Sequence, residues 1–207
     1  MRVYLKSLIL LLITGSLISL SGCKNDDPEP ENIPELVTKV TLKFTPAGGG
    51  AEVTVTATDP DGEGVQDIKV DGSINLIKGT QYTLALELIN GLYKVGEDGY
   101  NITAEVEEEG DEHQFFFRFS EGAFSSPTGT GNIKDNSSSI AGSINYLDKD
   151  VNNLPIGIST SWTSSSVATS DKSFRVVLKH QPDIKSSTST SLDGESDLDI
   201  SFVLNVN

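Results

Sequence analysis

The chain has 207 residues, with 15 Lys and Arg against 30 Asp and Glu, a formal net charge of −15 and one cysteine. This acidic balance argues against nucleic acid and anionic lipid as partners, because both bind through basic faces. A single cysteine excludes a disulfide framework, so a hydrophobic core must hold the fold together.

The N-terminus has the pattern of a secretory signal. Arg2 and Lys6 give a basic start, and the segment from Ser7 to Leu20 consists almost entirely of apolar and small residues. These 14 residues are too few to cross a hydrocarbon core of about 30 Å, which needs roughly 20 helical residues. A basic start and a short apolar run therefore predict a cleaved signal peptide over residues 1–22.

The end of this run, Leu20-Ser21-Gly22-Cys23, resembles the lipobox of bacterial lipoproteins. The resemblance implies cleavage before Cys23 and acylation of its thiol, and more than one acyl chain attaches a protein stably to a membrane. The acidic run from Lys24 to Glu31 resembles the post-cysteine segment of Bacteroidota lipoproteins. Its charge and proline content predict an extended tether over residues 23–35. We therefore expect a lipid-anchored outer-membrane protein that faces either the periplasm or the cell surface.

Residues 36–207 show a hydrophobic alternation of period two, as in Val40, Leu42 and Phe44. The segments with this alternation are 40–45, 53–58, 82–88, 102–106, 115–119, 144–146, 156–162, 174–179 and 198–206. Short strands separated by turn residues predict an all-β fold, an immunoglobulin-like antiparallel β-sandwich. No segment shows a capped helical period, so we expect no helix. Residues 120–143 are rich in Ser, Gly, Thr and Asn and form either a long loop over one sandwich, which we favour, or a linker between two β units.

Nearly the whole chain resembles an uncharacterised family of Bacteroidota lipoproteins, and three motifs carry the resemblance. They are Val40-Thr41-Leu42-Lys43-Phe44-Thr45-Pro46 with the glycines that follow, Asp-Glu-His-Gln-Phe-Phe-Phe at 111–117, and Leu-Lys-His-Gln-Pro-Asp at 178–183. The resemblance implies an envelope protein with a β fold, and it implies no activity and no site residues.

The segment Asp59-Pro60-Asp61-Gly62-Glu63-Gly64-Val65-Gln66-Asp67 resembles the calcium loops of thrombospondin-type repeats, with Glu63 where aspartate is usual. The resemblance implies Asp59, Asp61, Glu63 and Asp67 as ligands, in keeping with the preference of calcium for carboxylate oxygens. The alternative is an acidic β-turn, because Asp-Pro-Asp-Gly is strong turn chemistry by itself. Calcium here would stiffen a loop rather than support catalysis.

The two histidines form a second candidate site. His113 shares the strand phase of Phe115 and Phe117, and His180 shares that of Val176 and Leu178, so both rings should face inward. One histidine opens its strand and the other closes its own, and such positions meet at one edge of an antiparallel sheet. With Glu109, Asp111, Glu112 and Asp183 nearby, they favour a zinc or copper site. The alternative is two unrelated histidines that bond to backbone or water.

No residue pattern typical of catalysis is present: Gly-x-Ser-x-Gly, P-loop and dinucleotide motifs are all missing from the sequence. We therefore expect no enzyme, but a binding or accessory module held by Cys23. Such a module would bind an ion or a small ligand, or would assist an outer-membrane transporter. The alternative is a structural or adhesive surface module in which calcium stiffens the loop at 59–67.

Overall fold

The computed structural model describes residues 35–62, 67–134 and 142–207, which belong to one compact unit, Asn32–Asn207. The predicted signal peptide, Cys23 and Glu63 lie outside the described residues, so the expectations for them stay predictions. Within the described ranges, no helix has the length and apolar character needed to cross a membrane.

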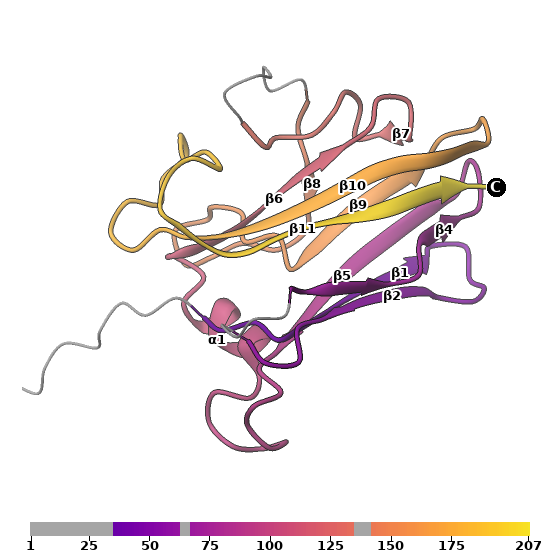
Figure 1. Cartoon of the computed structure of the whole chain (residues 1–207). Coiled ribbons are helices and arrows are strands. Elements are labelled where there is room, and N and C mark those ends of the chain that lie inside the picture. The colour runs from indigo at the N-terminus through magenta and orange to yellow at the C-terminus, as the bar shows by residue number, and fades with distance from the viewer. Residues whose placement is uncertain (1–34, 63–66, 135–141) are drawn as a thin grey trace, which may run out of the picture. The chain divides into compact units, whose positions relative to one another are not determined.

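The described strands form two sheets, which are drawn in Figure 1. The first sheet contains, in spatial order, β3 (Lys69–Asp71), β2 (Val53–Thr58), β1 (Lys39–Pro46), β5 (Gln81–Ile89), β9 (Ser159–Ser164) and β7 (Phe124–Ser126), and β8 (Asn145–Tyr146) also pairs with β9. The second sheet contains β4 (Ile74–Leu76), β11 (Glu195–Val206), β10 (Thr169–His180) and β6 (His113–Phe119). All the strand pairs are antiparallel except β4 with β11.

One hydrophobic core joins the two sheets and confirms the predicted all-β sandwich. Strand β1 alternates as expected, with Val40, Leu42 and Phe44 fully buried. The core is richest in aromatic rings around Trp162 of β9, whose ring centroid lies 5.1 Å from that of Phe174 in the opposite sheet. Burial of large aromatic side chains from both inner faces is the main source of stability in such a sandwich.

Each sheet takes strands from both halves of the chain. Strand β5 pairs with β9, and β6 pairs with β10, so the partners come from either side of residues 120–143. This pairing agrees with the single-sandwich interpretation and leaves neither half with a complete sheet of its own.

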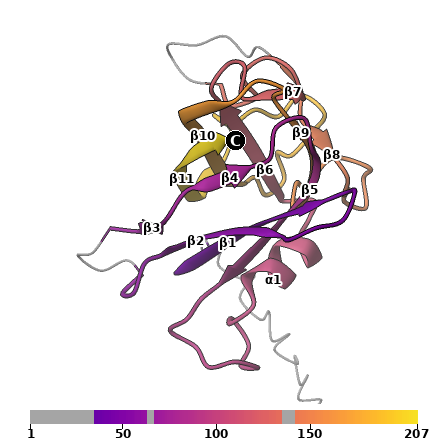
Figure 2. The same ribbon diagram turned by 90° about the vertical axis from the view of Figure 1, so that its right-hand side faces the viewer.

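The expected strand at 102–106 is wrong, as is the expectation of no helix. Residues Ile102–Glu108 form helix α1, which lies beside the end of β5 (Figure 2). The side chain of Asn101 caps the helix by accepting a hydrogen bond from the Ala104 backbone N–H at 3.3 Å. Ile102 and Val106 are both buried, and a spacing of four residues puts them on one face of a helix as well as on one face of a strand.

Candidate metal site

The two histidines lie opposite each other in neighbouring strands of the second sheet. His113 begins β6 and His180 ends β10, and the antiparallel register pairs them directly. Their buried rings stack with centroids 4.5 Å apart and planes within 5° of parallel. The sequence prediction that these rings meet at one edge of the sheet is confirmed.

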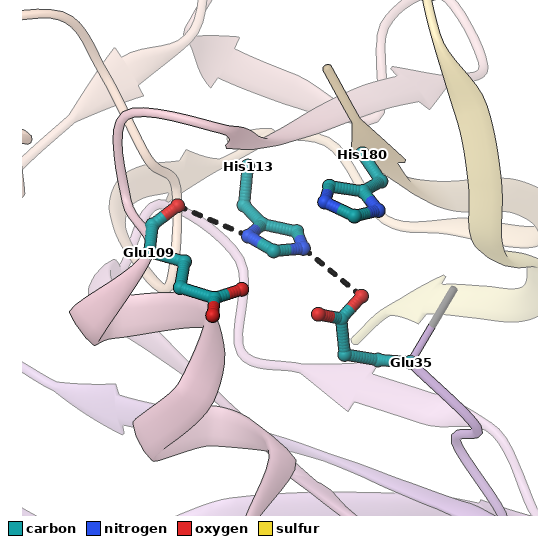
Figure 3. Close-up of side chains that lie close together, drawn as sticks. All are labelled: Glu35, Glu109, His113 and His180. Carbon is teal, nitrogen blue, oxygen red and sulfur yellow. Dashed lines mark hydrogen bonds and ion pairs between the residues drawn. The ribbon is translucent and has the colours of Figure 1, made fainter. Parts of the chain in front are cut away.

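Two carboxylates from other parts of the chain join the histidines. Glu35 precedes β1, and Glu109 follows the last residue of α1. The side-chain ligand atoms of Glu35, Glu109, His113 and His180, which we call the histidine cluster, all lie within 4.8 Å of one another (Figure 3). Glu109 was among the acids expected here, whereas Glu35 was expected only as the end of the tether. The Glu35 side chain is 9% exposed.

Hydrogen bonds fix the tautomer of His113. Its Nδ1 lies 3.0 Å from the backbone carbonyl oxygen of Glu109, which only accepts, so Nδ1 carries a proton and donates it. Its Nε2 lies 3.0 Å from Oε2 of Glu35, which is also an acceptor (Figure 3). A second proton or another cation must therefore lie between Nε2 and the carboxylate.

The electrostatics of this pair agree with its geometry. Burial by itself favours the neutral ring of His113, but the hydrogen bond and the charge of Glu35 outweigh burial and raise the pKa of His113. Burial alone would raise the pKa of Glu35, but the hydrogen bond and the charge of His113 lower it. The site therefore favours an anionic carboxylate beside a positive charge.

Asp197 is a further buried carboxylate beside His113 that sequence reasoning missed. The register of β10 against β11 shifts between Leu178 and Lys179 and leaves Asp197 unpaired in a β-bulge. A bulge re-aims a side chain, and here the Asp197 side chain is 0% exposed with Oδ2 3.8 Å from Nε2 of His113. Neither of its oxygens accepts a hydrogen bond from a donor among the described residues.

The surroundings of Asp197 disfavour its charge. Burial and the negative charge of Glu35 together raise the pKa of Asp197 to about 7, although the positive charges of His113 and Lys179 act in the opposite direction. Two carboxylates are both acceptors, so Asp197 bonds to Glu35 only when a proton lies between them. A cation placed between the two groups would remove the same repulsion.

Other polar groups near the cluster fix the backbone and side chains around it. His180 contacts Glu112, with 3.4 Å between Nε2 and Oε2. Lys185 forms an ion pair of 2.8 Å with Asp150, and both side chains are 1% exposed. The Lys185 ammonium also donates to the carbonyl oxygen of Gly110 at 2.5 Å, which fastens the turn between α1 and β6. Of the other acids expected near the histidines, Asp111 and Asp183 do not belong to the cluster as the described residues define it.

The expected calcium loop is described only in part. The backbone N–H of Asp61 donates to Oδ1 of Asp59 at 3.3 Å, which is the turn chemistry of the alternative interpretation. Asp67 is exposed, and Glu63 lies outside the described residues. Among the residues that the structure describes, Asp59, Asp61 and Asp67 do not form a close group of possible ligands. The calcium assignment stays a prediction.

The histidine cluster groups residue types that could hold an ion. It combines imidazole nitrogens and carboxylate oxygens, the ligands that zinc and copper accept in proteins. No protein-family model matches this chain, and no curated protein or solved structure shows significant similarity to it. The functional interpretation therefore depends on the residues of this chain alone.

Proposed function

We propose that this protein is a non-enzymatic envelope lipoprotein whose β-sandwich binds zinc or copper at the histidine cluster. The observation that carries the proposal is the 3.0 Å separation between Nε2 of His113 and Oε2 of Glu35. With Nδ1 held as a donor by the Glu109 carbonyl, Nε2 is the ring nitrogen that faces the Glu35 carboxylate and could bind a cation there. This is the arrangement by which a backbone carbonyl orients a metal-binding histidine.

The ligand types favour a transition metal over calcium or magnesium. Hard divalent cations take oxygen ligands in proteins. Imidazole nitrogens are preferred by zinc, copper, iron and nickel, and both histidines of the chain are in this cluster. Burial of the two rings also keeps water from competing for their nitrogens.

The anchor is part of the same proposal. The lipobox-like Leu20-Ser21-Gly22-Cys23 supports lipidation of Cys23 at the outer membrane. Residues 23–207 carry 13 basic and 30 acidic residues, a net charge of −17, because Arg2 and Lys6 are the charged residues that precede Cys23. An acidic, membrane-held module attracts cations to its surface, which suits delivery of an ion to an outer-membrane transporter. Incorporation of labelled palmitate that disappears in Cys23→Ser would support this anchor.

The metal is tested with the full-length protein, purified in detergent without a histidine tag and treated with a chelator. Thermal melting is followed while zinc, copper or calcium is added. A metal at 100 times its Kd should stabilise the fold by about 2.7 kcal/mol, which is a rise of roughly 5–10 °C in Tm. His113→Ala and His180→Ala are the test variants, and Glu121→Gln, at an exposed acid outside the cluster, is the control.

The outcomes separate the interpretations. A zinc or copper shift that is lost in His113→Ala and kept in Glu121→Gln would support the proposal. If neither metal shifts Tm, or if His113→Ala responds as the wild type does, the proposal is wrong. A shift with calcium alone that disappears in Asp61→Ala would favour the calcium-stiffened surface module.

A further inference from the structure

Building on the proposed metal binding, we propose that a zinc ion is held by Nε2 of His113 and the carboxylates of Glu35 and Asp197. The bound ion would thereby fasten the segment before β1 to the bulge in β11. This ligand set replaces Glu109 of the histidine cluster with Asp197 and gives His180 a supporting role.

The spacing of His113 from each of the two carboxylates fits tetrahedral zinc. Zinc lies about 2.0–2.2 Å from nitrogen and oxygen ligands, so two ligand atoms of a tetrahedral site are separated by about 3.3–3.5 Å. The observed distances from Nε2 of His113 are 3.0 Å to Oε2 of Glu35 and 3.8 Å to Oδ2 of Asp197. Shifts of a few tenths of an ångström would place an ion among them.

The stacked rings argue against a site shared by both histidines. A metal ion lies close to the plane of each imidazole that binds it, because the nitrogen lone pair is in that plane. The two ring planes are nearly parallel and their centroids are 4.5 Å apart, so no single point lies in both planes. In this orientation His180 supports the His113 ring by stacking, and its own Nε2 faces Glu112.

Asp197 is a better ligand than Glu109 on grounds of burial and bonding. The Glu109 residue is exposed and acts through its backbone carbonyl, which holds Nδ1 of His113. The Asp197 side chain is fully buried, faces His113, and lacks a hydrogen-bond donor among the described residues. Buried carboxylates are normally hydrogen-bonded, paired or coordinated to a metal. A cation between His113 and Asp197 would give this buried carboxylate a partner.

The ligand set links three segments that are far apart in the sequence. Glu35 stands before β1 in one sheet, whereas His113 and Asp197 come from β6 and β11 of the other. An ion bound to all three would link the two sheets at this end of the sandwich and hold the chain where the predicted tether ends. Metal binding would therefore restrain residues 35–38 against the sandwich.

The test measures zinc affinity by isothermal titration calorimetry on the full-length protein in detergent. Asp197→Asn and Glu35→Gln keep the shape of each side chain and should weaken Kd at least about tenfold, since even indirect partners of metal ligands cost 10–100-fold. Glu121→Gln, at an exposed acid outside the cluster, is the control and should leave Kd unchanged, and Glu109→Gln is measured beside it. Hydrogen exchange of residues 36–38 should slow on addition of zinc in the wild type and not in Glu35→Gln.

Each result has one meaning. If zinc binding is lost in His113→Ala but is equally tight in Asp197→Asn and Glu35→Gln, this ligand set is wrong and the proposed function stands. If the wild-type protein does not bind zinc, both are wrong. Should Asp197→Asn fail to fold, Glu35→Gln carries the same test at the other carboxylate. A loss confined to Glu109→Gln would likewise overturn the assignment.

Discussion

Replacing Asp197 by asparagine should stabilise the metal-free protein at neutral and alkaline pH. The Asp197 carboxyl is fully buried, and neither oxygen accepts a hydrogen bond from a donor within the described part of the chain. The groups that face it are Glu35, His113 and Lys179. Asparagine has nearly the same shape, carries no charge at any pH, and presents an N–H that can donate to Glu35.

The size and sign of the effect follow from the pKa of Asp197, which rises from 3.8 to about 7 on folding. At about 1.4 kcal/mol for each pH unit, ionisation of this group costs the folded state about 4 kcal/mol. Between these two pKa values the folded protein retains a proton that the unfolded chain has lost. The contribution of Asp197 to stability is therefore present at acidic pH and is lost as the pH rises toward 8.

The assay is urea unfolding in the presence of a chelator at pH 4, 5, 6, 7 and 8. Relative to the wild type, Asp197→Asn should gain up to about 4 kcal/mol between the lowest and highest pH. The matched control is Asp199→Asn, two residues along the same strand, which breaks the partly exposed Arg175–Asp199 ion pair. That change should cost less than about 1 kcal/mol, because exposed ion pairs contribute little.

A difference in stability between Asp197→Asn and the wild type that stays constant from pH 4 to pH 8 would refute this reasoning. It would mean that water or a conformational change relieves the buried charge.

Three further stability predictions concern the frame of the site and the core, and each is checked by urea unfolding. Lys185→Met should cost about 3–5 kcal/mol, because it breaks the buried ion pair with Asp150 and leaves that carboxylate without its cation. A loss below about 1 kcal/mol would show that the pair is hydrated. Trp162→Ala should cost about 3–5 kcal/mol, because this fully buried ring contacts both sheets. Gly194→Ala should be clearly more damaging than Gly49→Ala, which should cost about 1 kcal/mol. Both glycines have positive φ, but a Cβ on Gly194 would lie 2.0 Å from the His180 carbonyl oxygen whereas one on Gly49 contacts nothing within 4 Å.

The sequence by itself determined the longer strands and the core that they share. Period-two alternation in β1, β5 and β10 placed Val40, Leu84 and Val176 inside, and all three are fully buried. The same phase argument put both histidines on inward faces at strand ends. That prediction succeeded because an inward position in a strand follows from side-chain alternation, which is a local property.

The helix at 102–108 depended on a local cap together with tertiary contacts. Ile102 and Val106 fit either one face of a strand or one face of a helix, so their spacing does not distinguish the two. The choice comes from the Asn101 cap and from Thr103, whose hydroxyl bonds to the backbone of Leu88 at the end of β5. The Asn101 cap is local to the helix, whereas the Thr103 contacts exist only once β5 is in place.

The carboxylates of the candidate site also depend on tertiary structure. Glu35 follows an acidic, proline-rich run that reads as solvated chain, and no local pattern indicates that its side chain packs against His113. The alternation of this strand assigns Asp197 to the outer face, so the sequence gives no sign of an inward carboxylate there. The bulge opposite Leu178 and Lys179 turns its side chain inward. Alternation along a strand reports which side chains face the core, but a shift of register and a contact between distant segments arise only when the strands pair.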